Sequence, residues 1–397
     1  MSRTTLSPSA PALLPPSLLA RDLALRDLTD PAAGPHAIQL VVDDVIAALT
    51  TRWRTEVVLW RTHPVVAVED NYDRLGYPAD AAARSARYSR YVSETCMLRT
   101  HTSAMIPPLL RHLARVDRAG AVGDRLCVVP GITYRRDSID RLHTGTPHQV
   151  DLWRIVEHEP EAAALTTDDL DEMIRVVVGA VLPDAPLRST PSAHPYTEHG
   201  RQVEAHVRGE WVEVLECGMA APHVLASAGL DPDRVSGLAM GLGLDRLVML
   251  RKGVPDIRLL RATDPRITTQ LADLAPYAAV STHPAVRRDL SIAVAQDMDD
   301  ELLGDRVRDA LGPDAENVEA IEVRSETPYD GLPPAAVERL GMDRAQKNML
   351  VRVVLRGVDR TLTDAEANDL RDRIYAATHQ GQHHQWASPP ASVHDVT

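Results

Sequence analysis

Apolar and polar residues repeat with two periods along this chain of 397 residues. Apolar residues at helical spacing predict helices at 35–53, 98–118 and 168–182. Short runs rich in Val, Ile and Leu predict strands at 56–60, 65–68, 125–136, 148–156, 201–207 and 210–218. The strands at 125–136 and 148–156 flank one polar loop, so we expect them to form a long hairpin. Helices and strands together indicate a mixed α+β protein.

The pattern restarts near residue 282. Strands are expected at 287–294, 318–324 and 348–358, and helices at 299–311 and 363–377. Glu366 lies three residues after Thr363, which is the spacing of a capping box at the start of the last helix. This β-α-β-β-α order predicts a small split βαβ domain, although a final strand is not evident after residue 377.

Shifts in composition divide the chain into four segments. Residues 1–33 are rich in Pro and Ser and are expected to form a tail or linker, 34–270 a first α+β domain, 282–380 the second domain, and 381–397 a disordered tail. No apolar run reaches 18 residues, so no membrane-spanning segment is expected. The three cysteines lie far apart and form no metal or disulfide pattern, which favours a reducing cytoplasmic compartment.

A glycine-rich stretch, GLAMGLGLDRLVML at 237–250, places Asp245 and Arg246 among apolar residues. Because an unpaired buried charge costs several kcal/mol, either neighbours pair with both charges or Arg246 binds an anion. The glycines do not follow the GxGxxG dinucleotide pattern. Small residues let a strand approach a ligand closely, and an arginine in the first turn of the following helix suits a phosphate chain. We expect that helix to end at Gly253.

Two other polar stretches carry candidate chemistry. The sequence YRRDSIDRLHTGTPHQVD at 134–151 puts charged and amide side chains on a strand–loop–strand unit, namely Arg135, Arg136, Asp137, His143, Gln149 and Asp151. LRTHTS at 98–103 offers His101 and Ser103, which suit an ammonium or carboxylate group. Taken singly, a solvated charged hairpin explains the first stretch and a helix cap explains the second.

In this order and at these separations, RTHTS, YRRDSIDRLHTGTPHQVD and GLGLDRLVMLRKGVPDIR resemble the signatures of the class II aminoacyl-tRNA synthetases, and most closely those of the phenylalanine–tRNA ligase family. The resemblance covers roughly residues 60–380. It implies a catalytic antiparallel sheet flanked by helices over 34–270. In 282–380, HPAVRRDLSIAV and DRTLTDAEANDLRDRI resemble the family's ferredoxin-fold anticodon-binding domain. Both domains in one chain are similar to the single-chain, organellar type.

The resemblance implies ATP and Mg²⁺ as cofactors. Arg135 would bind the α-phosphate and the attacked carboxylate, and it would stabilise the transition state. His143 would reach the β- and γ-phosphates, and Arg246 would bind the γ-phosphate. Glu213 matches an acidic position that holds Mg²⁺ or the ribose. The other implied contacts to ATP are Asp137, Gly241 and Gly243.

The resemblance also implies an amino-acid site with four residues around the ammonium and carboxylate: His101, Ser103, Gln149 and Asp151. Its side-chain pocket would include His194, Tyr196, Ala239 and Glu216. The chain departs from the family here, because bacterial relatives have Phe-Pro-Phe where it has His194-Pro195-Tyr196, and Glu216 replaces a usual Gly. A carboxylate lining an apolar pocket is costly unless it is paired, so Glu216 either turns outward or contacts a polar group of an unusual substrate.

Charge and composition change the picture in two ways. The net charge is −13 and that of 282–380 is −7, from 13 Lys and Arg against 20 Asp and Glu. Neither value suits general nucleic-acid binding, so DNA is not an expected partner, and tRNA binding would need a local basic patch formed by Arg287, Arg288, Arg352, Arg356 and Arg360. The chain also contains no Phe. We hypothesise that it can be translated when charged phenylalanine tRNA is scarce, as a backup or resistance enzyme would require; drift in a Phe-poor lineage is the alternative.

Three functions remain open from the sequence. The first is a ligase that activates phenylalanine, or a close aromatic analogue, as the adenylate and transfers it to tRNA. The second is a paralogue that activates another amino acid for a different acceptor, which Glu216, His194 and the acidic second domain favour. The third is a non-catalytic binding protein, against which the intact Arg135, His143 and Arg246 argue.

Overall fold

The computed structural model describes residues 13–85, 88–116, 122–159, 164–280 and 283–384. The chain forms two compact units. The first takes the residues up to Arg135, together with Thr146–Val254 and Leu271–Tyr277. The second takes Arg136–Gly145, Pro255–Gln270 and the residues from Ala278 onward. No helix in the described parts of the chain is long and apolar enough to cross a membrane.

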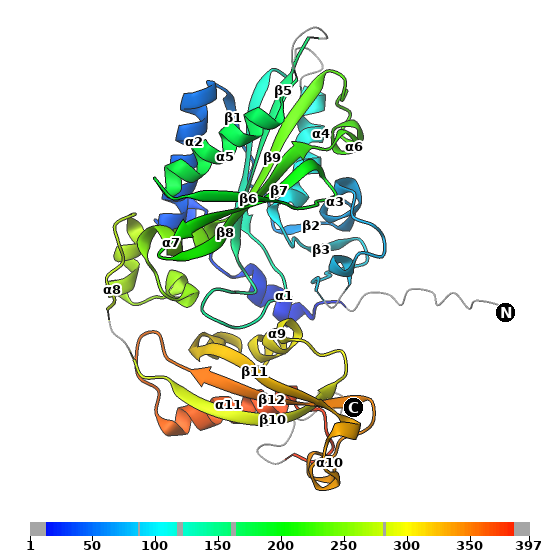
Figure 1. The fold of residues 1–397 in the computed structure, drawn as a ribbon, viewed down its shortest axis with the longest axis vertical. Helices are drawn as coiled ribbons and strands as arrows, with labels where there is room; N and C mark the ends of the chain where they lie inside the picture. The colour runs from blue at the N-terminus through cyan, green and yellow to red at the C-terminus, as the bar shows by residue number, and fades with distance from the viewer. Residues whose placement is uncertain (1–12, 86–87, 117–121, 160–163, 281–282, 385–397) are drawn as a thin grey trace, which may run out of the picture. The chain divides into compact units, whose positions relative to one another are not determined.

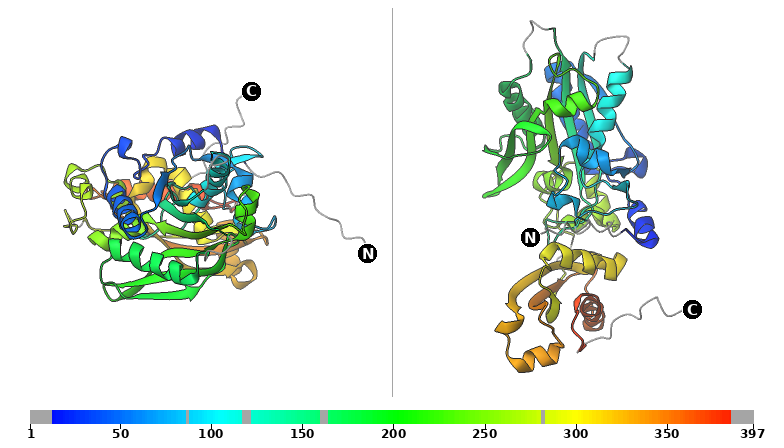
Figure 2. Two further views of the ribbon diagram at one scale, coloured as in Figure 1. Left: turned by 90° about the horizontal axis from the view of Figure 1, so that it is seen from above. Right: turned by 90° about the vertical axis from the view of Figure 1, so that its right-hand side faces the viewer.

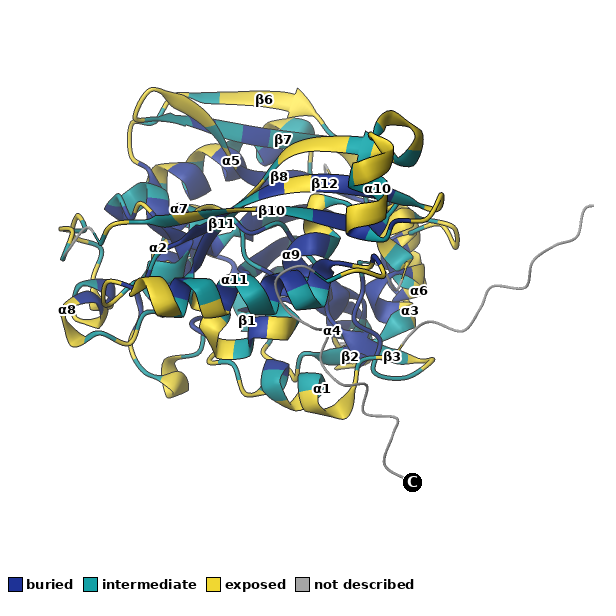
Figure 3. Cartoon of the chain, turned by 90° about the horizontal axis from the view of Figure 1, so that it is seen from below, coloured by how far each residue is buried: buried dark blue, intermediate teal, exposed yellow. Residues whose placement is uncertain are grey.

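The first unit is built on a seven-stranded sheet with the strand order β1-β4-β5-β9-β8-β7-β6 (Figure 1). All pairs are antiparallel except β1 with β4. The strands are β1 (Glu56–Leu59), β4 (Asp124–Ile132), β5 (His148–Glu157), β6 (Leu187–Pro191), β7 (Thr197–Val207), β8 (Glu210–Ala220) and β9 (Val235–Gly243). The β4–β5 hairpin expected from the sequence is confirmed, and the glycine-rich stretch forms the central strand β9. Figure 3 shows β6 as the exposed edge strand.

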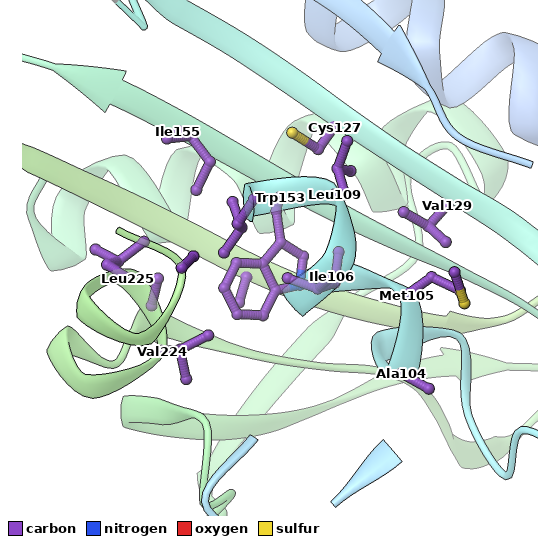
Figure 4. Close-up of a cluster of buried hydrophobic side chains, with 14 of the residues drawn as sticks. Ala104, Met105, Ile106, Leu109, Cys127, Val129, Trp153, Ile155, Val224 and Leu225 are labelled. Carbon is purple, nitrogen blue, oxygen red and sulfur yellow. The ribbon is translucent and has the colours of Figure 1, made fainter. Parts of the chain in front are cut away.

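Helices lie on both sides of this sheet (Figure 2). One side carries α2 (Ala37–Trp53), α5 (Thr167–Val181) and α7 (Leu244–Lys252). The other side carries α3 (Val68–Asn71), the short helix η4 (Thr102–Met105), α4 (Ile106–Val116) and α6 (Pro222–Ser227), with the small ribbon of β2 (Val65–Ala67) and β3 (Cys96–Leu98). Trp153 of β5 lies in the centre of the core on this second side (Figure 4).

Local sequence signals determine several helix ends. Thr166 and Asp169 form a capping box at the start of α5, and α7 ends at Gly253, whose φ of 78° is the left-handed conformation that glycine adopts without strain. The helix expected within 98–118 is shorter than its range, because α4 begins only at Ile106, after β3 and η4.

The N-terminal residues differ from the expected tail or linker from residue 16 onward. Helix α1 (Pro16–Leu23) is followed by Leu28 and Thr29, both buried, and the Leu28 amide donates a hydrogen bond to His148 Nε2 at 3.1 Å. The proline and serine residues of this stretch form a helix start and turns. They do not prevent packing, because Pro is compatible with the first position of a helix. Residues 1–12 lie outside the described residues.

The second unit contains a three-stranded antiparallel sheet with the order β10-β12-β11. Its elements are β10 (Val286–Ala295), α9 (Asp300–Leu311), β11 (Val318–Pro328), α10 (Pro334–Leu340), β12 (Gln346–Leu355) and α11 (Asp364–Thr378), and α8 (Pro265–Thr268) also belongs to this unit. Helices α9 and α11 share one core with the sheet, and the predicted Thr363–Glu366 capping box is present. The five predicted elements are present in the predicted order, but the additional short helix α10 lies between β11 and β12, in the stretch from which no helix was expected.

The missing last strand of this second sheet is replaced by a short segment. The Gln380 amide donates to Ala293 O at 2.8 Å, and the Ala293 and Ala295 amides donate to the side chains of His379 and Gln380. These bonds satisfy the free edge of β10 without a regular strand, which explains why no strand pattern is visible after residue 377. Of the expected tail, residues 385–397 lie outside the described residues.

Gly131 provides a test of the packing in the first unit. A Cβ at this position would lie 1.9 Å from Nη2 of Arg99, whose side chain is buried and whose Nε donates to Ile132 O at 2.8 Å. Because Arg99 is buried and held, it cannot move aside at low cost. We expect Gly131→Ala to lower the free energy of unfolding by roughly 1–3 kcal/mol in urea titration. Gly179→Ala in α5, where a Cβ meets nothing within 4 Å, should instead raise it by about 0.5–1 kcal/mol. Equal effects at both positions would contradict this packing.

Candidate active site

The charges in the glycine-rich stretch have different surroundings. Asp245 is buried in the first turn of α7, and its carboxylate accepts hydrogen bonds from the backbone N–H of His148 at 2.5 Å and from its Nδ1 at 3.0 Å. Because His148 Nε2 accepts from the Leu28 amide, Nδ1 is the ring nitrogen that donates to Asp245. The network joins the N-terminal segment, β5 and α7, and it accounts for the buried Asp245.

Arg246, the next residue, is available to an external anion. Within the described part of the chain it has no carboxylate partner within 4.0 Å. It lies in the first turn of α7, where partial positive charge from the helix favours an anion. The strand before it is bare, because a Cβ on Gly243 would meet nothing within 4 Å.

Arg135 and Arg246 act on the same carboxylate. Burial raises the pKa of Glu213 on β8, the charge of Glu216 raises it further, and the charges of Arg246 and Arg135 lower it. The two guanidinium groups therefore lie within electrostatic range of one point on the sheet, although they are more than 100 residues apart in the sequence. The structure brings together Arg135, Glu213 and Arg246, with Gly241 and Gly243 on the adjoining strand.

A second group surrounds Asp151 on β5. The hydroxyl of Thr102 donates to Asp151 Oδ2 at 2.6 Å and Trp153 Nε1 donates to Oδ1 at 3.2 Å. Burial raises the pKa of Asp151, while hydrogen bonds from Thr102, Ser103 and Trp153 oppose the shift. Gln149 lies two residues earlier on the same side of β5, and its Oε1 accepts from the Thr102 amide at 3.3 Å. Ser103, Gln149 and Asp151 thus lie together, and their role in binding an amino acid stays a prediction.

His101 belongs to a cluster of five rings, the aromatic cluster, formed by Tyr77, His101, Trp153, His194 and Tyr196. Its ring stacks on Tyr77 with centroids 5.7 Å apart. Both ring nitrogens are buried, and neither makes a hydrogen bond of normal geometry to a described residue. Burial lowers the pKa of His101 to about 4, and the charge of Arg135 contributes, so the ring is neutral at pH 7.

Glu216 contacts His194, one of the five rings of this cluster. His194 Nε2 lies 3.0 Å from Glu216 Oε1, and Ser192 donates to the same oxygen at 3.4 Å. The hydrogen bond with His194 is the main cause that lowers the pKa of Glu216, so the carboxylate is ionised at neutral pH. The ring of His194 lies 5.8 Å from that of Tyr196. The costly unpaired carboxylate that the sequence raised does not occur, because Glu216 is paired. Ala239 is buried opposite Trp153 in the β5–β9 register.

Two predicted ATP contacts lie in the second unit, on the segment Arg136–Gly145. His143 Nδ1 is 2.7 Å from Asp140 Oδ2. Asp137 is buried, its side chain accepts from the Ser138 amide at 3.0 Å, and its carbonyl oxygen accepts from Arg308 of α9. Their part in the site stays a prediction.

Sequence reasoning missed the residues that complete the site. Tyr77 stacks on His101, Thr102 holds Asp151, and Trp153 contributes both a ring and a hydrogen bond. Tyr77 and Trp153 have no distinctive local pattern, because an aromatic residue in a strand or loop reads as core. Thr102 stood inside the RTHTS motif, so its hydroxyl was the one signal that the sequence offered.

A comparison with known protein families identifies the family of this chain. Residues 22–271 match the family model described as "tRNA synthetases class II core domain (F)", which is more than half of the chain. The chain belongs to this family. Its first unit has the fold expected for a class II synthetase core, a largely antiparallel sheet flanked by helices, with a further C-terminal sheet domain.

Individual relatives carry consistent names. The chain is 36% identical over 200 residues to the phenylalanine–tRNA ligase alpha subunit of Nostoc punctiforme. This match covers 50% of the chain and 56% of that subunit. It therefore spans only about half the length of the alpha subunits that it matches. It is 27% identical to the chloroplastic/mitochondrial phenylalanine–tRNA ligase of Arabidopsis thaliana, over 78% of this chain and 68% of that one. It is 26% identical to the mitochondrial enzyme of Saccharomyces cerevisiae, over 85% of each.

The class II core buries a carboxylate that opposes folding, and this can be measured. Because the pKa of Asp151 in the folded state lies above its ordinary value of 3.8, ionisation destabilises the folded state, and the cost grows as the pH rises above that value. We expect Asp151→Asn to gain stability relative to the wild type in urea titrations as the pH rises from 4 to 7. Asp184→Asn, at an exposed loop position, should show no such trend. A loss of stability in Asp151→Asn that is largest at pH 7 would contradict this account.

Proposed function

We propose that the chain activates phenylalanine, or a close aromatic amino acid, with ATP and transfers it from the adenylate to tRNA. The observation that supports the proposal is that the charges of Arg135 and Arg246 both act on Glu213 of the sheet, and that Arg246 has no carboxylate partner within 4.0 Å among the described residues. The relatives that match most of the chain are named phenylalanine–tRNA ligases, which supports this choice.

The arginines would act by charge and position. Arg135, whose planar fork suits two oxygens, would bind the α-phosphate and the attacking carboxylate, and Arg246 would bind the γ-phosphate. His143 would contact the β- and γ-phosphates. Negative charge spreads over the equatorial oxygens of the α-phosphate in the transition state, and fixed guanidinium groups stabilise it there. The rate increase would come from orientation and electrostatics, without a covalent enzyme intermediate.

Magnesium would be held partly by ATP itself. Among the described residues, no group of three or more His, Cys, Asp or Glu side chains is arranged to hold a metal ion. Glu213 lies near both arginines, and Mg²⁺ usually binds one or two carboxylates together with substrate phosphates. Glu213 therefore fits a site that forms with ATP. The ion would neutralise phosphate charge.

The amino acid would be bound at the other end of the site. Asp151 and the neutral His101 would face the ammonium group, with Ser103 and Gln149 beside them. The aromatic cluster and Ala239 would contact the side chain. In this arrangement the buried carboxylate at position 151, which costs stability, would have a binding function.

The second unit bears on the proposed acceptor, tRNA. Four of the five arginines expected to form a basic patch are ion-paired, in the pairs Arg288–Asp364, Arg352–Asp289, Arg356–Glu319 and Arg360–Glu366. The partner carboxylates largely neutralise the charge of these four arginines. Support for tRNA as the acceptor therefore comes from the names of the relatives and from the β-α-β-β-α domain.

The proposed function is tested by isotope exchange between pyrophosphate and ATP with each amino acid, followed by charging of bulk tRNA. We expect exchange with an aromatic amino acid and charging. Arg246→Ala should lower kcat/KM for exchange by about 10²–10³ because a fixed charge on the transferred group is lost. Arg251→Ala on the same helix is the matched control and should retain activity. No exchange with any amino acid would overturn the proposal, and exchange without charging would redirect it to another acceptor.

We also propose that the absence of Phe makes synthesis of this chain independent of charged phenylalanine tRNA, as a backup ligase requires. When the resident ligase of the source cells is inhibited, pulse labelling should show continued synthesis of the wild-type chain. A variant with Trp211→Phe and Leu59→Phe, both exposed positions, should stop. Deleting the gene should increase sensitivity to the inhibitor. Unchanged sensitivity, or equally Phe-free proteins throughout the genome, would contradict the backup role.

A further inference from the structure

Glu216 lies in the same cross-strand row as Asp151. Glu216 on β8 is paired with Gly241 on β9, and Gly241 is paired with Asp151 on β5. Directly opposed residues in a sheet share a face, so both carboxylates lie on the side that carries Trp153. Gly241 has no side chain, and a Cβ there would still be 4.0 Å from Asp151 Oδ2. The sheet is therefore bare between the two carboxylates.

The Glu216 carboxylate is fixed but not buried. His194 Nε2 and the Ser192 hydroxyl both contact Oε1, which restricts the side chain to one orientation. The Glu216 side chain is 42% exposed, whereas that of His194 is 10% exposed. One oxygen is thus used within the protein, and the carboxylate remains accessible to a further hydrogen-bond donor.

The carboxylate is connected to the aromatic cluster through His194. The ring of Tyr196 lies 5.8 Å from His194, 6.3 Å from Trp153 and 6.4 Å from Tyr77. The charge of Glu216 also acts on the hydroxyl groups of Tyr77 and Tyr196. A ligand ring packed against the His194 and Tyr196 part of the aromatic cluster would therefore lie beside this carboxylate.

Hydrogen bonding to the Glu216 carboxylate determines which ligand ring this arrangement prefers. An unsubstituted ring placed against Glu216 would remove water from the carboxylate and return no hydrogen bond. A ring hydroxyl would return one, and hydrogen bonds to an ionised acceptor are stronger than neutral ones. Sites that present a polar group to a substrate hydroxyl discriminate strongly against the analogue without it.

We propose that Glu216, held by His194, makes this site select aromatic amino acids whose ring carries a hydroxyl group, with the carboxylate accepting that hydroxyl's hydrogen bond. The inference rests on the proposed activation of an aromatic amino acid and narrows its substrate. Glu216 and His194 are then specificity-determining residues.

The test compares kcat/KM for pyrophosphate exchange with phenylalanine and with ortho-, meta- and para-tyrosine. In the wild-type chain we expect at least one hydroxylated substrate to exceed phenylalanine by about 10-fold or more. Glu216→Gly and the near-isosteric Glu216→Gln should both reduce this ratio at least about 10-fold. In the Gln variant the main cause should be a loss of activity with the hydroxylated substrate. In the Gly variant it should be a gain of activity with phenylalanine. Glu210→Gln, exposed on the same strand, is the matched control and should leave the ratio unchanged.

A second readout does not need turnover. Calorimetric titration of the same amino acids, in the presence of a non-hydrolysable ATP analogue, should give the same order of affinities, and thermal melting checks that each variant is folded. Preference for phenylalanine in the wild type, or a ratio that neither Glu216 variant changes, would overturn this inference and leave the proposed function standing. Silence with every amino acid in both assays would overturn both.

Discussion

The hydrogen bonds between Asp245 and His148 are the constraint on which the candidate site depends. A buried carboxylate needs partners, and here one histidine supplies both a backbone and a ring donor, while its second ring nitrogen accepts from Leu28. The network fixes the start of α7 against the start of β5. Arg246 follows Asp245 directly, and Gln149 and Asp151 follow His148, so one buried network positions residues at both ends of the site.

The sheet carries charges of both signs at the candidate site. The charges of Arg135 and Arg246 both act on Glu213, and that of Arg135 also acts on Glu216, while Asp151 and Glu216 lie on the side of the aromatic cluster. Gly241 leaves the sheet bare between Asp151 and Glu216, and a Cβ on Gly243 would meet nothing within 4 Å. A molecule with a phosphate chain and an amino acid with an ammonium group would be oriented by these charges before any reaction.

The sequence predicted most of the elements but not all of their partners. The β4–β5 hairpin, the end of α7 at Gly253 and the capping box at Thr363 follow from local signals, because strands, caps and left-handed glycines depend on neighbouring residues. Arg135, Glu213 and Arg246 were found through motif order and lie together. Tyr77 and the Glu216–His194 pair required the structure, since these contacts join segments that no local pattern connects. The packing of residues 16–33 was hidden for the same reason, because its partner His148 is 120 residues away.

The most direct measurement of the central claim is a crystal structure of the protein with ATP, Mg²⁺ and a non-reactive aromatic amino-acid analogue. The account predicts a bent nucleotide on strand β9 of the sheet, with its α-phosphate at Arg135 and its γ-phosphate at Arg246. It also predicts that the analogue's ring lies against Tyr196. A nucleotide bound elsewhere, or phosphates that touch neither arginine, would contradict it.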